Sequence, residues 1–231
     1  RPFHHKRRPL FQDLVHAYPG VLSVDSITAH HGKIVYTEHH TDAEEPGIIW
    51  FTDVTARVKH LYSDTTVSKP HDTLIVAAQA LAMGKGEIQF ESKGLLKDPQ
   101  NSFVCTGLVE NIPVAAFNPI LVPNATIEAL DGHVHGIYFN FIVDNSFANG
   151  DLIFRYQDLH LQKVDDETPV SKGLKDRVLT RVLNHQIIDH NPLPDDTLRT
   201  GTIYFERDPE KMYFSYMLKS IFSGIKETVM K

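Results

Sequence analysis

The feature that most constrains this chain is the alternation of apolar and polar residues in segment after segment. In "GEIQFES", Ile88 and Phe90 alternate with Glu87, Gln89 and Glu91, which is typical of a β-strand with one buried face. Such segments follow one another through turns, and no helix separates them in a βαβ pattern. This order argues against a parallel α/β sheet and predicts an antiparallel meander.

The most regular strand pattern covers residues 47–63, "GIIWFTDVTARVKHLYS". Alternation there places Trp50 and Val54 on one face, and Asp53 and Arg57 on the other. The pattern predicts one uninterrupted strand with an apolar side and a polar side.

Turn residues divide the other strand segments. Residues 21–40, "VLSVDSITAHHGKIVYTEHH", are predicted to form two strands joined by a turn at "HHGK", since Gly32 favours a turn there. Further breaks are expected at Asp131-Gly132 and around residues 145–150. About nine strands are predicted in total.

Three helices are predicted beside the strands. The first lies within residues 9–20 and the second within 171–188, while "IPVAAFNPIL" is a short helical or irregular connector. In the last, Asp208 is expected as N-cap and Pro209 as first helical residue, so that Glu206-Arg207 closes the preceding strand. Its expected apolar stripe consists of Phe214, Met217, Leu218, Ile221, Ile225 and Val229.

These elements predict a mainly β (α+β) fold with a curved antiparallel meander, an apolar concave face and about three short helices. Residues 1–19 are expected to be a linker with a short helix. Residues 20–231 are expected to form one β-rich domain that ends in the amphipathic helix.

Composition excludes several classes of partner. The net charge is −6, so general affinity for nucleic acid is not expected. No apolar run approaches the ~18 residues that a membrane-spanning helix needs. Cys105 is the single cysteine, which leaves no disulfide framework and no thiolate metal site.

No motif in the chain points to catalysis. GxSxG and HExxH are absent, and Cys105 lies inside a strand, where a buried and unreactive thiol is expected. In "HVH", His133 and His135 lie on the same side of an extended segment and are weak candidates for a metal site. The prediction is a protein that is not an enzyme and needs no cofactor.

Bulky apolar residues gather on one side of several strands. Three modest helices are too few to cover about nine strands, so part of this side is expected to stay open and to need a ligand or partner. The candidate residues of this face are Trp50, Val54, Ile88, Phe90, Ile137, Phe139, Phe141, Phe154 and Phe205.

Two segments carry a family resemblance. "VDSITAHHGKIVYTEH" resembles a repeated strand signature of the C-terminal region of AsmA-like proteins. "GTIYFERDPEKMYFSYMLKSIFSGIKETV" resembles the C-terminal end of the large AsmA-like proteins of Bacteroidetes-type bacteria, and the hairpins between fit the same region. The resemblance covers most of residues 20–230, and the family belongs to the bridge-like lipid transfer group.

The resemblance implies a periplasmic domain of a cell-envelope protein anchored in the inner membrane. It also implies lipid binding, with phospholipid acyl chains held in an apolar β-groove during outer-membrane biogenesis. Because the chain begins with Arg1 and lacks a signal-peptide pattern, it is expected to be a piece of a longer protein. The alternative is a structural or interaction module of the envelope that docks a protein partner through the C-terminal helix.

Overall fold

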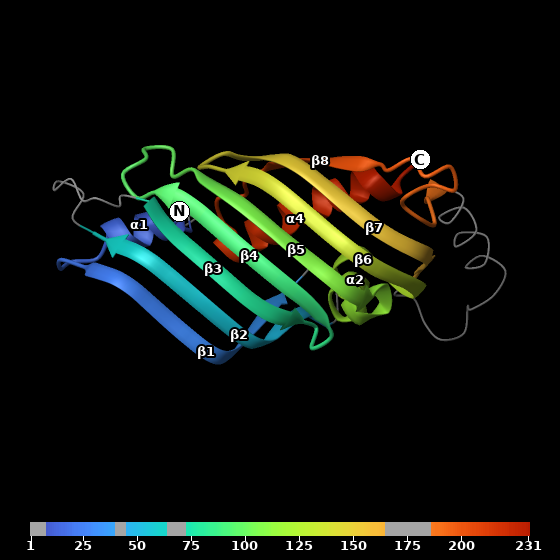
Figure 1. Ribbon diagram of the computed structural model, residues 1–231, viewed down its shortest axis with the longest axis horizontal. Coiled ribbons are helices and arrows are strands. Elements are labelled where there is room, and N and C mark those ends of the chain that lie inside the picture. The colour runs from blue at the N-terminus through green and yellow to red at the C-terminus, as the bar shows by residue number, and fades with distance from the viewer. Residues whose placement is uncertain (1–7, 40–44, 64–72, 165–185) are drawn as a thin grey trace, which may run out of the picture.

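Eight long antiparallel strands form one sheet in chain order, from β1 at one edge to β8 at the other (Figure 1). The structure is a computed structural model, and it describes residues 8–39, 45–63, 73–164 and 186–231. It confirms the mainly β meander that alternation predicted. The strands are β1 (Ser23–Glu38), β2 (Gly47–Tyr62), β3 (Thr73–Ala82), β4 (Gly86–Leu95), β5 (Phe103–Pro113), β6 (Ile127–Val143), β7 (Phe147–Lys163) and β8 (Thr200–Glu206).

Three α-helices and one 3₁₀ turn accompany the sheet in the described residues. They are α1 (Phe11–His16), η1 (Val114–Phe117), α2 (Asn118–Ala125) and α4 (Tyr213–Val229). The first helix and the helical connector are therefore confirmed. The helix predicted within 171–188 falls almost entirely outside the described residues.

Two expected turns are bends within continuous strands. His31 adopts a positive φ of 52° and the pairing of β1 with β2 shifts on both sides of Gly32, yet the strand continues. At Asp131-Gly132 the pairing of β6 with β7 shifts in the same way. A bulge inserts an extra residue and bends a strand without ending it, so the sheet has eight strands instead of about nine.

Asp53 changes the face on which its neighbours lie. Its φ of 51° marks a bulge, and the register between β2 and β3 shifts between Thr52 and Thr55. Strict alternation put Trp50 and Val54 on one face, and this prediction is wrong. The extra residue leaves Val54 buried on the same face as Phe51, whose ring meets Phe214 of α4, and turns Trp50 to the opposite side.

The last helix begins later than its capping sequence indicated. Its N-cap is Met212, while Asp208 accepts a hydrogen bond from the backbone N–H of Glu210 inside the preceding loop. Asp208 therefore stabilises a turn, and the prediction that it caps the helix is wrong. Glu206 does end β8, and Arg207 is buried, donating to the backbone oxygens of Arg8 and Asn145.

The sheet curls around α4, which lies behind it in Figure 1. The ring of Tyr36 on β1 lies 4.9 Å from that of Phe214 at one end of α4. Near the other end, the backbone of Gly224 abuts Gly201 on β8. One helix touches both edge strands of an eight-stranded sheet only if the sheet is concave on that side. We call the side toward α4 the inner face and the opposite side the outer face.

Candidate functional site

Five of the predicted lipid-facing side chains lie in the closed core. Val54, Ile137, Phe139, Phe141 and Phe154 are at most 5% exposed. The prediction that they form an open apolar surface is wrong, because the curled sheet and the helical elements packed on it, α2 and η1 as well as α4, already cover them. Their burial makes them contributors to stability.

The remaining predicted residues are only partly covered. Ile88 and Phe90 are half-buried on the inner face of β4, and Phe205 is half-buried on β8 against the ring of Tyr216. Trp50 is half-buried on the outer face. Of the nine predicted side chains, Ile88, Phe90 and Phe205 keep a partly open apolar surface on the side of α4.

The inner face is less covered toward β1. One cross-strand row pairs Ile27 with Val58, Val58 with Val76, and Val76 with Ser92. Ser92 at the β4 end is buried, Val76 and Val58 are half-buried, and Ile27 at the β1 edge is 45% exposed. Exposure along this row is therefore lowest at β4 and highest at the first strand.

The neighbouring row shows the same gradient. Ala29 pairs with Ala56, Ala56 with Ala78, and Ala78 with Phe90. Ala29 is exposed, and the other three are half-buried. Small side chains here leave room on the inner face, with Phe90 as the one large ring.

Small residues of α4 form its closest contact with the sheet. Ser220, Gly224 and Thr228 are buried at four-residue spacing, on the same side of the helix as the larger, buried Tyr216. Gly224 allows the helix to approach Gly201, where an added Cβ would lie 2.1 Å from the Gly224 carbonyl oxygen. The backbones therefore meet directly at β8.

The large apolar residues of α4 are mostly half-buried. Among the members of the predicted stripe only Met217 is buried. The helix therefore rests on its small residues and keeps partly exposed hydrocarbon beside them. The half-buried members of the stripe are Phe214, Leu218, Ile221, Ile225 and Val229.

One ion pair ties β1 to α4. Lys219 Nζ lies 2.8 Å from Glu38, which also accepts hydrogen bonds from Tyr36 and, at 3.4 Å, from Ser215. Burial by itself would raise the pKa of Glu38. The hydrogen bond and charge of Lys219, together with Tyr36 and Lys211, outweigh burial and hold that pKa below its ordinary value.

The buried thiol is unsuited to nucleophilic chemistry. Cys105 is fully buried, and burial raises its pKa to about 11, although hydrogen bonds with Ser92 and Tyr213 act in the opposite direction. The thiolate is the reactive form, and at neutral pH it is a negligible fraction.

The histidine pair was a weak candidate for a metal site. The rings of His133 and His135 lie 5.1 Å apart, and His135 Nε2 is hydrogen-bonded to Gln157. Across residues 8–39, 45–63, 73–164 and 186–231, no three His, Cys, Asp or Glu residues gather as a potential metal-binding group.

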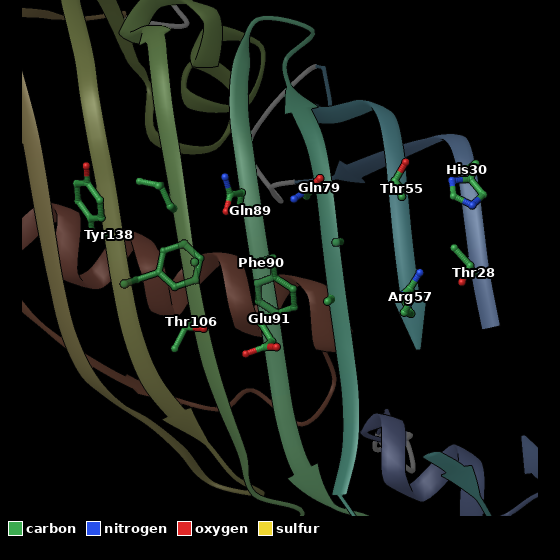
Figure 2. Close-up of a pocket in the computed structure, with 15 residues that line it drawn as sticks. Thr28, His30, Thr55, Arg57, Gln79, Gln89, Phe90, Glu91, Thr106 and Tyr138 are labelled. Carbon is green, nitrogen blue, oxygen red and sulfur yellow. The ribbon is translucent and has the colours of Figure 1, made fainter. Parts of the chain in front are cut away.

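The outer face carries a groove that sequence reasoning missed. It has a volume of about 760 Å³ and extends from β1 to β6 (Figure 2). Its polar lining comes from outward-facing positions of the same strands whose apolar side was predicted to bind. The labelled lining residues are Thr28, His30, Thr55, Arg57, Gln79, Gln89, Phe90, Glu91, Thr106 and Tyr138.

The signal for this groove was present in the sequence. Gln79 interrupts the small apolar run "AAQALA", and Gln89 and Glu91 are the outward residues of "GEIQFES". Outward polar residues on a half-buried sheet are ordinary, so only the cross-strand register shows that these residues adjoin.

Comparisons with protein-family models, curated proteins and solved structures find no significant match. The resemblance to AsmA-like proteins therefore stays a prediction. In the described part of the chain, none of the helices has both the length and the apolar character that crossing a membrane requires.

Proposed function

We propose that this domain is a non-catalytic binder of phospholipid acyl chains. The site is the β1–β4 part of the inner face together with the half-buried large residues of α4. One observation carries the proposal: apolar exposure rises from buried Ser92 to Ile27, which is 45% exposed. Hydrocarbon placed there would complete the burial of a surface that the chain covers only in part.

Acyl chains fit the chemistry of this surface. Each CH₂ group that leaves water for an apolar environment gains about 0.8 kcal/mol, so a long chain is held without any specific polar contact. The inner rows offer aliphatic side chains and one aromatic ring, Phe90. They offer no charged side chain between Ile27 and Val76.

The proposed site is smaller than the one expected from the sequence. Core residues such as Phe139 and Phe141 are replaced by Ile27, Val58 and Val76 as the contact surface, and Phe90 is retained. Under the resemblance to AsmA-like proteins, the domain would act in the periplasm as part of a protein anchored in the inner membrane. There it would contribute to lipid transport toward the outer membrane.

In the alternative, the domain is an envelope interaction module without a lipid ligand, and α4 would dock a protein partner. Docking a partner on α4 requires a free helix face, whereas the side that carries Ser220, Gly224 and Thr228 is already packed on the sheet. Only the half-buried side remains for a partner, and that side is part of the proposed lipid site.

The test is binding of a fluorescent palmitoyl probe to the purified chain, with native mass spectrometry to detect co-purified phospholipid. Ile27→Glu places a charge on the proposed surface at an exposed edge position. We expect it to weaken probe binding about tenfold or more, since a carboxylate beside hydrocarbon must be desolvated.

Ile142→Glu is the matched control. Ile142 is 51% exposed on the outer face, where its register partners are Val104 and Asn149. It should leave binding unchanged. Absence of both probe binding and co-purified lipid would refute the proposal, as would equal weakening by the two variants. A protein partner captured by a chain that binds no lipid would support the alternative.

A further inference from the structure

The outer-face groove consists of two adjacent rows of side chains that cross the strands (Figure 2). The first row runs through register partners on β2 to β6, with His30 of β1 beside its end. The second row lies two residues away along each strand that it shares with the first, on the same face of the sheet, and begins on β1. The first row is Thr55, Gln79, Gln89, Leu108 and Tyr138; the second is Thr28, Arg57, Ala77, Glu91 and Thr106.

Apart from the Tyr138 hydroxyl, which donates to Glu110, the polar side chains of the first row have no hydrogen-bond partner among the described residues. No hydrogen bond joins the side chains of Thr55, Gln79 or Gln89 to another residue in the described part of the chain. Each amide offers two donors and an acceptor, and each hydroxyl is both donor and acceptor. A line of such groups is thus available to a bound molecule.

Short residues form the floor of the groove. Ala77 separates Arg57 from Glu91 in the second row, and Gly107 lies between Thr106 and Leu108 on β5. The backbone is therefore reachable between the longer side chains. Because every lining residue lies on a paired strand, the arrangement is held rigidly before a ligand arrives.

The groove lining includes one arginine and one glutamate, which carry opposite charges. Arg57 is its only arginine, and Glu91 forms an ion pair with Lys93 beside the groove. A polyanion such as nucleic acid needs several clustered cations, which this lining does not provide. The balance favours an uncharged ligand held by hydrogen bonds.

An extended peptide is a poor fit for the same place. Peptides that bind sheets usually add to a free edge, where backbone groups are unpaired, or dock apolar anchors in pockets. Here the strands on both sides of Gln79 and Gln89 are already paired, and the first row has Leu108 as its only aliphatic side chain.

An aromatic ring stands at the β6 end of the groove. Tyr138 is 39% exposed; its ring lies over Gly136, and its hydroxyl makes a long hydrogen bond of 3.4 Å to Glu110. Aromatic rings combine an apolar face with a polar edge. Such a ring packs against the C–H face of a pyranose, while amides and hydroxyls bind the sugar hydroxyls.

We propose that this groove binds a neutral oligosaccharide that lies across the strands. Six strands at about 4.8 Å spacing make the groove on the order of 24 Å long, enough for several sugar rings in a row. The proposal does not rest on lipid binding: the two rows that carry it lie on the opposite face, and Phe90 is the one residue named for both sites.

The experiment is calorimetric titration of the full chain with three neutral hexasaccharides: maltohexaose, cellohexaose and N-acetylchitohexaose. At least one should bind saturably at millimolar concentration. The double variant Gln79→Ala/Gln89→Ala should weaken that binding about tenfold, since two hydrogen-bonding amides are lost. Tyr138→Ala should weaken it similarly, while Tyr138→Phe keeps the ring and the affinity.

Asn149→Ala is the matched control, because Asn149 is an exposed amide on the outer face of β7, outside the groove lining. It should bind as the unaltered chain does. Failure of all three sugars to bind overturns the proposal. So does binding that Gln79→Ala/Gln89→Ala leaves unchanged, or binding of a sulfated heparin hexasaccharide in place of the neutral ones. Ile27→Glu should leave sugar binding intact, which separates this result from the lipid test.

Discussion

The β1–β4 half and the β5–β8 half of the inner face are built from the same alternating pattern but are covered differently. Phe139 and Phe141 on β6 are at most 4% exposed, whereas Phe90 on β4 is half-buried and Ile27 on β1 is 45% exposed. Strand composition does not explain the contrast, since both halves present apolar residues inward.

The position of α4 explains it. Gly224 and Thr228 bring the helix against Gly201 of β8, and no comparable backbone contact ties it to β2 or β3. Toward β1 the helix is held by the rings of Phe214 and Tyr36 and by the Glu38–Lys219 ion pair. A close small-residue contact at one edge and a side-chain contact at the other leave the rows that run from Ile27 and Ala29 toward Phe90 less covered.

The largest expected effect compares one phenylalanine from each half. Phe141→Ala should lower the free energy of unfolding by about 3–5 kcal/mol, because it leaves a cavity in a closed core. Phe90→Ala should cost only about 1–2 kcal/mol, since water already reaches part of the ring. Urea denaturation followed by circular dichroism measures both.

Equal losses in these two variants would contradict the distinction between the halves. Tyr204→Ala is a useful third variant, because Tyr204 is 60% exposed on the outer face and stacks on Phe147. Its loss should be smaller than that of Phe90→Ala. Across the three variants, the loss in free energy of unfolding should then follow the burial of the aromatic ring that is removed.

The next effect concerns the contact between α4 and β8. In Gly201→Ala the new Cβ would meet the Gly224 carbonyl oxygen at 2.1 Å, and backbone atoms yield less readily than side chains. We expect a loss on the order of 2–3 kcal/mol as the helix is displaced. Reaction of Cys105 with a thiol reagent under native conditions should become faster, because Tyr213 at the start of α4 lies against this thiol.

Thr202→Ala is the control for Gly201→Ala, since Thr202 is the exposed neighbour on the outer side of β8. It should change neither stability nor thiol reactivity by much. If Gly201→Ala were as stable and as unreactive as the unaltered chain, the helix would not depend on this contact.

The same contrast shows how far the sequence determines the fold. Alternation was sufficient to predict the meander and the inward direction of Phe139 and Phe141, and the two prolines of "IPVAAFNPIL" predicted the connector. It did not predict the bulges, because His31 and Asp53 are polar residues that adopt positive φ inside strands, where a turn or an outward position is the simpler interpretation.

The coverage of the inner face was also beyond sequence reasoning. It depends on where α4 lies, which small residues such as Ser220 and Gly224 decide, whereas the expected contact was the stripe of large residues. Alternation within a single strand can be seen in the sequence. The rows that form the outer groove instead join residues of different strands, from β1 to β6. Only the register brings Gln79 and Gln89 together.

The smallest expected effect tests the other end of α4. The pKa of Glu38 lies below its ordinary value in the folded protein, so its pairing with Lys219 stabilises the fold above the unfolded-state pKa, which is about 4.3 for a glutamate. That contribution is lost as the pH falls through the lower, folded-state pKa. Glu38→Gln should therefore lower the free energy of unfolding by less than about 1 kcal/mol at pH 7, which is seen as a slightly lower melting temperature. At pH 3 it should leave the melting temperature unchanged. Lys219→Met should behave in the same way, and the double variant should add little. A deficit that stays constant between pH 7 and pH 3 would show that packing around Tyr36 and Phe214, not charge, holds the helix to β1.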